Sequence, residues 1–587
     1  MKKGKGKWLR MLKNSVVYSW KAGPMIFLSV VLSSAAKSIF QLWEIYVLQR
    51  LFTSVTQLVS GEIVIREVYL VVVEVALILL ISQVIELLEY LSQGYYWRKG
   101  NGYLHSLLNK NLSRHSAIGF ENSEFLNDIE KASKGCEDAP DASRSFLQMI
   151  FYYVPFCILT GVYLYNILPV MVLALLIISV SVLVSEFIRA RQTYKYEDKV
   201  SDLNRRVDYY ERCIVSRDHL KETRFLGVKD YFLTKYDDTV SLLKTEFQRK
   251  EKFILKSSML LKLIDVTGYV LVFLILVLGM RQGFVSVVEF ATIYYAVEKV
   301  KSALENMIQC IGTALQSIAR MVFLFKFLDN PILEAEVKSS SLEGEEIILE
   351  NVSFRYPGTG EDVIQNLSLH VKKGETIAIV GDNGAGKSTL VKLLIGLYQP
   401  SEGTVAYART EGEGHDDGTG YINRSAVFQN FNKYYLSLED NVRISAPQRQ
   451  QDCKLLLQEV GLNLEKLSGD TCELLGREFG GTELSGGEWQ RIAIARGIYR
   501  RSNIIVLDEP TASIDPLEES RLFELFYKVS YGRTCILVTH RMGAVKMADR
   551  ILMLENGKVI EEGSHNDLMK KRGKYYDLYQ LQAKWYQ

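Results

Sequence analysis

The sequence predicts a multi-domain membrane protein, in which an all-α domain of six transmembrane helices precedes an α/β domain. Three observations predict this organisation. Long apolar runs are confined to residues before 330, a hydrophilic connector follows, and short β-rich runs then alternate with helical ones. We therefore place the membrane domain at 1–330, a linker at 331–345 and the α/β domain at 346–587.

The membrane domain contains six mostly apolar segments, each close to the roughly 20 residues that cross a hydrocarbon core. A buried helix of a soluble protein explains one such segment, but hardly six in alternation with charged connections. The last segment continues as a helix toward residue 328. The six segments are 25–50, 66–91, 146–166, 168–188, 258–280 and 285–308.

The basic residues of the connections predict the orientation. The short connections contain a single Lys or Arg, Arg281, whereas the long connections 92–145 and 189–257 are rich in both. Positive residues mark the cytoplasmic side, so both termini and both long loops are expected there. The basic N-terminus and the apolar run 25–36 resemble a secretory signal, but the further spans favour an uncleaved first membrane helix.

Charge and cysteine content exclude other classes of protein. Seventy Lys and Arg balance 68 Asp and Glu for a net charge of +2, which is not the basic composition of a nucleic-acid-binding protein. The seven cysteines lie at long spacings without a C-x-x-C pair. Neither a disulfide framework nor a zinc site is therefore predicted.

A glycine-rich loop in the α/β domain has the spacing of a phosphate-binding loop. The strand-like run 376–380 leads into Gly381-Asp382-Asn383-Gly384-Ala385-Gly386-Lys387-Ser388-Thr389, and a helix opens at Leu390. This is G-x-x-x-x-G-K-[ST] between a strand and a helix. The glycines let backbone N–H groups converge on phosphate oxygens, Lys387 adds positive charge, and Ser388 can ligate Mg²⁺.

A second strand-like run ends in two acids. Residues 504–507 are all apolar, and Asp508 and Glu509 follow them. Beside a phosphate-binding loop, the first acid is placed to hold Mg²⁺ through water, and the second to orient and deprotonate an attacking water. An apolar strand followed by acids is by itself a common surface ending, so this prediction depends on the loop.

A glycine-bearing turn, Leu484-Ser485-Gly486-Gly487-Glu488-Trp489-Gln490-Arg491, opens a further helix and suits an anion. Together with the phosphate-binding loop, this signature makes the chain resemble the ATP-binding-cassette (ABC) transporter family over essentially its whole length. The resemblance implies a type I exporter-like membrane domain, an ABC-type P-loop ATPase domain, and ATP and Mg²⁺ as cofactors. It also implies two cassettes that close head to tail, in a homodimer or in a heterodimer with a second half-transporter.

Other positions match the family one by one. Tyr356 resembles the aromatic residue that stacks on adenine, Gln429 the glutamine that touches Mg²⁺ and water, Asp515 the loop that spans the dimer, and His540 the histidine that contacts the γ-phosphate. The resemblance implies catalytic roles for Glu509, His540 and Gln429, and metal contacts for Ser388, Gln429 and Asp508. The implied nucleotide contacts are Tyr356, Gly381, Asn383, Gly384, Gly386, Lys387, Ser388, Thr389, Ser485, Gly486, Gly487 and Asp515.

Two cytoplasmic segments, 118–125 and 221–227, resemble the coupling helices of exporter-type ABC proteins. Ordinary amphipathic loop helices remain the alternative for both. The order of the domains, with the spans first, also resembles exporters and implies outward transport.

The segment before the signature departs from many exporters. Phe479 stands where an acid is expected, and Arg477 or Glu478 could substitute for it. This variant is similar to exporters of lantibiotics and other ribosomal peptides in Gram-positive bacteria. No cysteine precedes Cys136, so a fused leader-trimming cysteine protease is not expected.

Charged and amide side chains form stripes along three predicted spans. Five of these nine residues are glutamates and two are lysines. Two hypotheses remain open: an acidic hydrated cavity suited to a cationic or amphipathic peptide, or pairing between helices. The stripes are Lys37, Gln41 and Glu44; Glu86, Glu89 and Gln93; and Glu298, Lys301 and Glu305.

Three functions remain in view. The first is ATP-driven peptide export across the bacterial cytoplasmic membrane, with the cassette in the cytoplasm. A multidrug or lipid exporter would use the same ATP sites, and an ATP-gated regulator or channel is disfavoured by the intact Glu509. Expected partners are a second half-transporter, an exported peptide or amphipathic small molecule, the lipid bilayer and peptide-modifying enzymes, with no nucleic acid.

The glycine-rich stretch 409–420 is expected to be a surface insertion without an assigned role.

Overall fold

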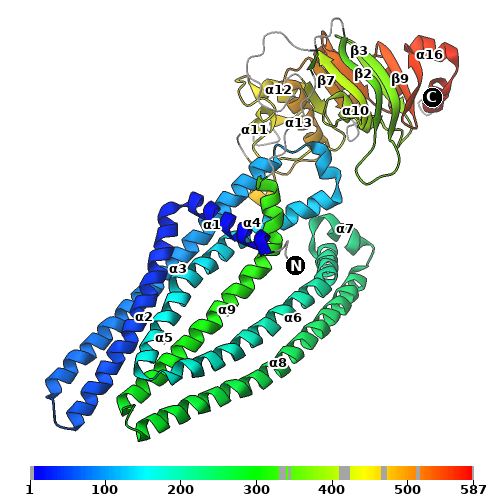
Figure 1. Ribbon diagram of the computed structural model, residues 1–587. Coiled ribbons are helices and arrows are strands. Elements are labelled where there is room, and N and C mark those ends of the chain that lie inside the picture. The colour runs from blue at the N-terminus through cyan, green and yellow to red at the C-terminus, as the bar shows by residue number, and fades with distance from the viewer. Residues whose placement is uncertain are drawn as a thin grey trace. The chain divides into compact units, whose positions relative to one another are not determined.

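The computed structural model describes residues 5–329, 339–340, 345–408, 424–464, 472, 474–510 and 516–584. The chain forms two compact units (Figure 1). The first comprises Met1–Ser113 and Asn127–Ile332, and the second comprises Arg114–Leu126 and Leu333–Gln587. A short piece of the first long connection, 92–145, is thus part of the second unit.

The first unit consists of long helices. The helix α3 has 48 residues, which corresponds to about 70 Å at 1.5 Å per residue and is more than twice the thickness of a hydrocarbon core. A helix of this length is longer than a bilayer crossing requires. The helices of this unit are α1 (Lys5–Ala22), α2 (Pro24–Val59), α3 (Ile65–Leu112), α4 (Ser123–Gln148), α5 (Val154–Ile167), α6 (Val170–Val215), α7 (Arg217–Phe225), α8 (Lys229–Arg281) and α9 (Val287–Asp329).

Two features of these helices were not expected from the sequence. The helix α1 precedes the first apolar segment, and a single π-helical turn, Met149–Tyr153, joins α4 to α5 in one continuous helix. The helix α4 also contains Pro140, which is buried.

Among the described residues, four helices are long and apolar enough to cross a membrane: α2, α3, the joined α4–α5 helix and α8. The predicted spans 168–188 and 285–308 lie in α6 and α9. The helix α9 is more polar because Glu289, Glu298, Lys299 and Lys301 fall within its first five turns. The two remaining spans thus stay predictions, whereas the other four have the composition of membrane helices.

The apolar core of this unit joins five helices. The helices α2 and α3 run side by side, as do α6 and α8 (Figure 1). A cluster of fully buried side chains connects α2, α5, α6, α8 and α9, and it includes Ile45, Phe156, Met171, Leu276 and Val297.

The polar stripes of α2 and α3 face each other. Lys37 Nζ lies 2.7 Å from Glu89 Oε2 and 3.7 Å from Glu86 Oε1. Glu89 is buried, and it also accepts a hydrogen bond from Gln148 Nε2 at 3.1 Å. Arg144 extends this network, since its Nη1 lies 3.1 Å from Gln93 Oε1 and 3.3 Å from Gln148 Oε1.

The other stripe residues of α2 also have partners. Tyr152 donates to Gln41 at 2.7 Å, Tyr295 donates to Glu44, and Lys299 Nζ lies 3.3 Å from Glu44. Of the two hypotheses for the stripes, the structure favours pairing between helices for α2 and for Glu89. An unpaired charge between these helices would be costly, and these contacts remove most of that cost.

We predict that Lys37→Met destabilises the protein by about 3 kcal/mol, because the substitution leaves the buried Glu89 carboxylate without its cation. The double variant Lys37→Met/Glu89→Gln should regain much of this loss. Thermal unfolding in nanodiscs measures the difference, with Glu86→Gln as control because that side chain is 60% exposed. Equal unfolding temperatures for Lys37→Met and Glu86→Gln would contradict the prediction.

The second unit contains two sheets. The smaller has the order β1-β5-β2-β3, and the larger has the order β10-β9-β4-β8-β7-β6. In the larger sheet, the five strands from β9 to β6 are parallel and β10 is an antiparallel edge. The strands are β1 (Ser339–Ser340), β2 (Glu345–Phe354), β3 (Ile364–Lys372), β4 (Thr376–Gly381), β5 (Glu402–Ala408), β6 (Arg424–Val427), β7 (Ile504–Asp508), β8 (Thr534–Val538), β9 (Arg550–Glu555) and β10 (Lys558–Gly563).

The strand-like runs predicted at 376–380 and 504–507 are confirmed as parts of β4 and β7. The helices between and after the strands also fit the predicted α/β alternation. They are α10 (Lys387–Leu394), α11 (Leu438–Arg443), α12 (Cys453–Glu459), α13 (Gly486–Tyr499), α14 (Pro516–Ser530), α15 (Met542–Val545), α16 (His565–Lys571) and α17 (Lys574–Ala583).

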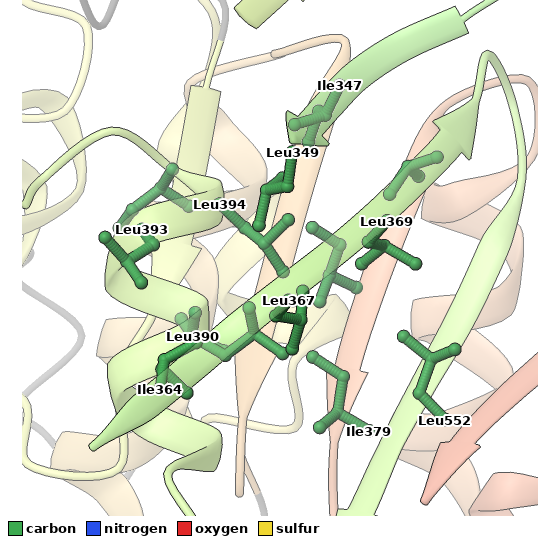
Figure 2. Close-up of a cluster of buried hydrophobic side chains, with 14 of the residues drawn as sticks. Ile347, Leu349, Ile364, Leu367, Leu369, Ile379, Leu390, Leu393, Leu394 and Leu552 are labelled. Carbon is green, nitrogen blue, oxygen red and sulfur yellow. The ribbon is translucent and has the colours of Figure 1, made fainter. Parts of the chain in front are cut away.

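The helix α10 is fixed between the two sheets. Its Leu390 and Leu394 are fully buried, and they pack in one cluster with Ile347 of β2, Leu367 of β3 and Ile379 of β4 (Figure 2). Each buried leucine contributes roughly 1.5–3 kcal/mol. This packing holds the start of α10, and with it the loop that follows β4.

Candidate active site

The predicted catalytic residues lie at one edge of the larger sheet. Since β4, β8, β7 and β6 are neighbouring parallel strands, their carboxyl ends meet there. The phosphate-binding loop follows β4, Glu509 follows β7, and His540 and Gln429 stand two residues beyond β8 and β6. Segments far apart in the sequence are thus brought to one place.

The phosphate-binding loop has the backbone that its glycines permit. Gly384 and Gly386 have φ angles of +82° and +99°, in the left-handed region. A Cβ on Gly386 would also lie 3.1 Å from the carbonyl oxygen of Val363. Gly386 caps the N-terminus of α10, so the loop N–H groups and the helix dipole are available to an anion. Asn383 is exposed on the same loop.

Lys387 is buried inside this loop. Its ammonium donates to the carbonyl oxygens of Gly381 and Asp382, both at 2.9 Å. Burial lowers the pKa of Lys387, while the charge of Glu509 acts in the opposite direction. A phosphate in the loop would give this cation an anionic partner.

Ser388 and Asp508 supply oxygen ligands of the kind that Mg²⁺ prefers. Asp508 is 5% exposed, and burial raises its pKa, although a hydrogen bond with Ser388 lowers it. Among the described residues no group of three or more His, Cys, Asp and Glu could hold a metal alone. This fits Mg²⁺, which is commonly bound by one or two protein ligands together with substrate phosphates and water.

Glu509 receives hydrogen bonds from two other strand ends. Gln429 Nε2 lies 2.6 Å from its Oε2, and His540 Nε2 lies 2.9 Å from its Oε1. Glu509 has a φ of +47°, which is unusual for a residue other than glycine, and its N–H bonds the carbonyl of Val538 at 2.9 Å. The structure therefore brings together the three residues predicted to be catalytic.

Tyr356 follows β2 near the phosphate-binding loop. Its hydroxyl lies 3.1 Å from Thr389 Oγ1, and its ring meets those of Phe354 and Tyr398 edge-on. The ring is half-buried. Tyr356 is thus fixed beside the loop, as the predicted contact with adenine requires.

The first predicted coupling segment is part of this unit. A short 3₁₀ helix, Ala117–Glu121, packs its first two residues against the core that surrounds α10. Tyr398 donates a hydrogen bond to Glu121, and Lys392 Nζ lies 3.7 Å from the same carboxylate. Burial and the neighbouring Glu121 raise the pKa of Tyr398. The sequence offered no signal for Tyr398 or Lys392, which belong to no motif.

The signature begins α13. Ser485 caps this helix in a capping box with Glu488, and Trp489 is buried beneath it. Ser485 and Gly486 are exposed, so the helix N-terminus is open to a ligand. The helix α13 packs on α11, α12 and β6. The predicted residue Asp515 lies outside the described residues.

The segment before the signature carries the unusual Phe479. Arg477 Nε lies 2.9 Å from Glu483, and Phe479 is 58% exposed with its ring 5.6 Å from that of Tyr435. The second predicted coupling segment overlaps α7, whose last residue, Phe225, is 91% exposed. Both aromatic side chains are accessible to a binding partner.

We predict that Glu509→Gln reduces ATP hydrolysis at least about 100-fold, because it removes the carboxylate that Gln429 and His540 both contact. Binding of a fluorescent ATP analogue should be retained, since the phosphate-binding loop is unchanged. Glu483→Gln, which alters an acid outside the site, is the control. Hydrolysis by Glu509→Gln at the rate of the control would contradict the assignment.

Comparisons with known proteins match this part of the chain to a known family. The family described as ABC transporter matches residues 364–512. The subtilin transport ATP-binding protein SpaT of Bacillus subtilis is 28% identical over 577 residues, which cover 93% of this chain and 90% of that protein. The nisin transport ATP-binding protein NisT of Lactococcus lactis subsp. lactis is 30% identical over 379 residues, which cover 61% of this chain and 62% of that protein.

A solved structure shares the fold of the whole chain. The structure of a bacterial Atm1-family ABC exporter with ATP bound superposes with a TM-score of 0.74 and covers 96% of this chain and 98% of its own, at 19% identity. The matched domain, the relatives and the shared fold lead to one conclusion. Residues 364–512 belong to the ABC transporter family, and the chain joins this ATP-hydrolysing domain to a helical membrane domain with the fold of an ABC exporter in one polypeptide.

Proposed function

We propose that two copies of this chain form an exporter that uses ATP to move a ribosomally synthesised, lantibiotic-like peptide outward across a bacterial cytoplasmic membrane by alternating access. The observation that carries the catalytic part is the contact of Gln429 and His540 with the two oxygens of Glu509. The peptide part is supported by SpaT and NisT, whose names assign them to subtilin and nisin transport.

The geometry suggests how the site turns over ATP. The loop N–H groups and Lys387 bind the phosphates, and Tyr356 provides a ring for the adenine. Ser388 and Asp508, with Gln429, would hold Mg²⁺, which would neutralise phosphate charge. Glu509 then orients and deprotonates water, while His540 contacts the γ-phosphate from its place beside Glu509.

In the described state, Gln429 and His540 occupy both oxygens of Glu509. For hydrolysis, at least one of these oxygens must turn to the attacking water. We infer that phosphate binding draws His540 away from Glu509, so that the base is released only when ATP is in place.

Exposed residues at the end of α7 and at the start of α13 support a dimer. A groove of about 390 Å³ in the second unit is lined by residues of the Gln429 loop and of α13, including Phe428, Phe431, Tyr434 and Arg496. Phe225, the last residue of α7, and Leu226, which follows it, are apolar and exposed. We propose that α7 of one copy occupies the groove of the other, and that the open signature helix covers the partner's ATP.

A cavity in the membrane domain offers mainly apolar walls to a substrate. It has a volume of about 230 Å³ and is lined by apolar residues of α2 and α3 such as Val47 and Ile78, together with Tyr295 and with Glu44, which is paired with Lys299. Apolar walls suit the apolar side chains of an amphipathic peptide. The basic residues of the long connections support an orientation with the ATP site in the cytoplasm.

The direct test is ATP-dependent uptake of a labelled cationic lantibiotic precursor into inside-out vesicles. We expect uptake with the natural chain and none with Glu509→Gln. Uptake of a labelled lipid or dye but not of the peptide would show that the substrate is not a peptide. ATP-dependent ion conductance without uptake would make the protein a regulated channel.

A second prediction tests the groove. Phe225→Asp should reduce transport about tenfold or more, because it removes an apolar anchor from the docking helix, while basal ATP hydrolysis stays within about twofold. Tyr231→Asp replaces another exposed aromatic residue on the adjoining α8 and serves as control. Normal transport by Phe225→Asp would exclude this docking mode.

A further inference from the structure

The C-terminal helix α17 is firmly attached to the larger sheet. Tyr575 is fully buried and packs with Val380 of β4 and Met553 of β9. Glu561 of β10 accepts hydrogen bonds from the N–H groups of Lys574 and Tyr575, at 2.6 and 3.3 Å. The start of the helix is therefore fixed, and its remaining side chains have defined positions.

The first residue of α17 contacts the phosphate-binding loop. Lys574 Nζ lies 3.2 Å from Asp382 Oδ2 and donates to Glu555 at the end of β9. The main-chain carbonyl of Asp382 is one of the two that accept a hydrogen bond from Lys387. One residue of the loop is thus held by two lysines, one through its side chain and the other through its backbone. Hydrogen bonds to Glu555 and Asp382 raise the pKa of Lys574, so it is charged at neutral pH.

The other end of α17 contacts the segment that carries His540. Gln582 Nε2 donates to the carbonyl oxygen of His540 at 2.6 Å, and Gln582 Oε1 accepts from the N–H of Met542 at 3.3 Å. One amide side chain therefore bonds the backbone on both sides of Arg541. The imidazole of His540 points to Glu509 at 2.9 Å.

We propose that α17 is a brace that holds the phosphate-binding loop and the His540 segment at a fixed separation, with Gln582 as a positioning residue for His540. The two contacts are eight residues apart, or about 12 Å along the helix. This inference rests on the proposed role of His540 in ATP hydrolysis. Gln582 does not touch the reacting atoms, and it acts by fixing the backbone that carries the imidazole.

The brace predicts a separation of kinetic effects. His540 acts on ATP that is already bound, so Gln582→Ala, which removes both hydrogen bonds to the His540 segment, should lower kcat about tenfold, with the KM for ATP within about twofold. Lys574→Met loosens the loop that binds the phosphates, so it should mainly raise the KM. The measurement is ATP hydrolysis by the full chain in nanodiscs.

Two further variants make the test specific. Gln582→Glu keeps the acceptor for Met542 but loses the donor to His540, so it should behave like Gln582→Ala and not like the natural chain. Gln580→Ala removes the same type of side chain from the same helix and should leave both constants within about twofold. Thermal unfolding of each variant identifies any loss through misfolding.

The outcomes are distinct. An unchanged kcat for Gln582→Ala, or natural kinetics for Gln582→Glu, would overturn the positioning role. If Glu509→Gln also hydrolysed ATP normally, the proposed catalytic site itself would fail. A lower kcat for both Gln582 variants at unchanged unfolding temperature supports the brace.

Discussion

Charged groups that leave water need partners, and this constraint shapes both units of the protein. In the helical unit, Glu89 is buried against Lys37 and Gln148. In the ATP-binding unit, Lys387 is enclosed by two carbonyl oxygens of its own loop, and Glu509 by Gln429 and His540. The two sets of partners differ in their surroundings. Those of Glu89 lie inside the helical unit, whereas those of Lys387 and Glu509 lie at or just beyond the ends of strands of the larger sheet.

The sequence predicts those parts of the site in which the functional residues follow one another closely in the chain. The phosphate-binding loop, the Asp508–Glu509 pair and the signature are short segments, and each carries its own strand or helix. Once β4, β6, β7 and β8 are known to be parallel neighbours, their carboxyl ends bring Gln429, Glu509 and His540 together. The helical stripes were visible too, but spacing along one helix does not reveal that Lys37 faces Glu89 on the next.

The remaining parts depend on contacts between distant segments, for which spacing holds no information. Tyr398 and Glu121 are 277 positions apart, and Gln582 and His540 are 42 apart. None of these contacts belongs to a motif that sequence reasoning could use. The helix α1 was missed for another reason: it is amphipathic and basic, so it carries neither the apolar length of a span nor an α/β pattern. Such contacts join segments of the second unit that are far apart in the sequence.

The π-helical turn between α4 and α5 has an effect on the whole helix that contains it. A turn of this kind accommodates one residue more than regular geometry, so every side chain from Val154 onward is rotated by one position relative to an unbroken helix. The direction in which the polar residues before the turn point therefore does not fix the direction of the apolar residues after it. The polar residues are Arg144 and Gln148, and the apolar ones are Phe156 and Leu164. One additional residue in a single turn thus lets the two halves of one long helix present their side chains to different neighbours.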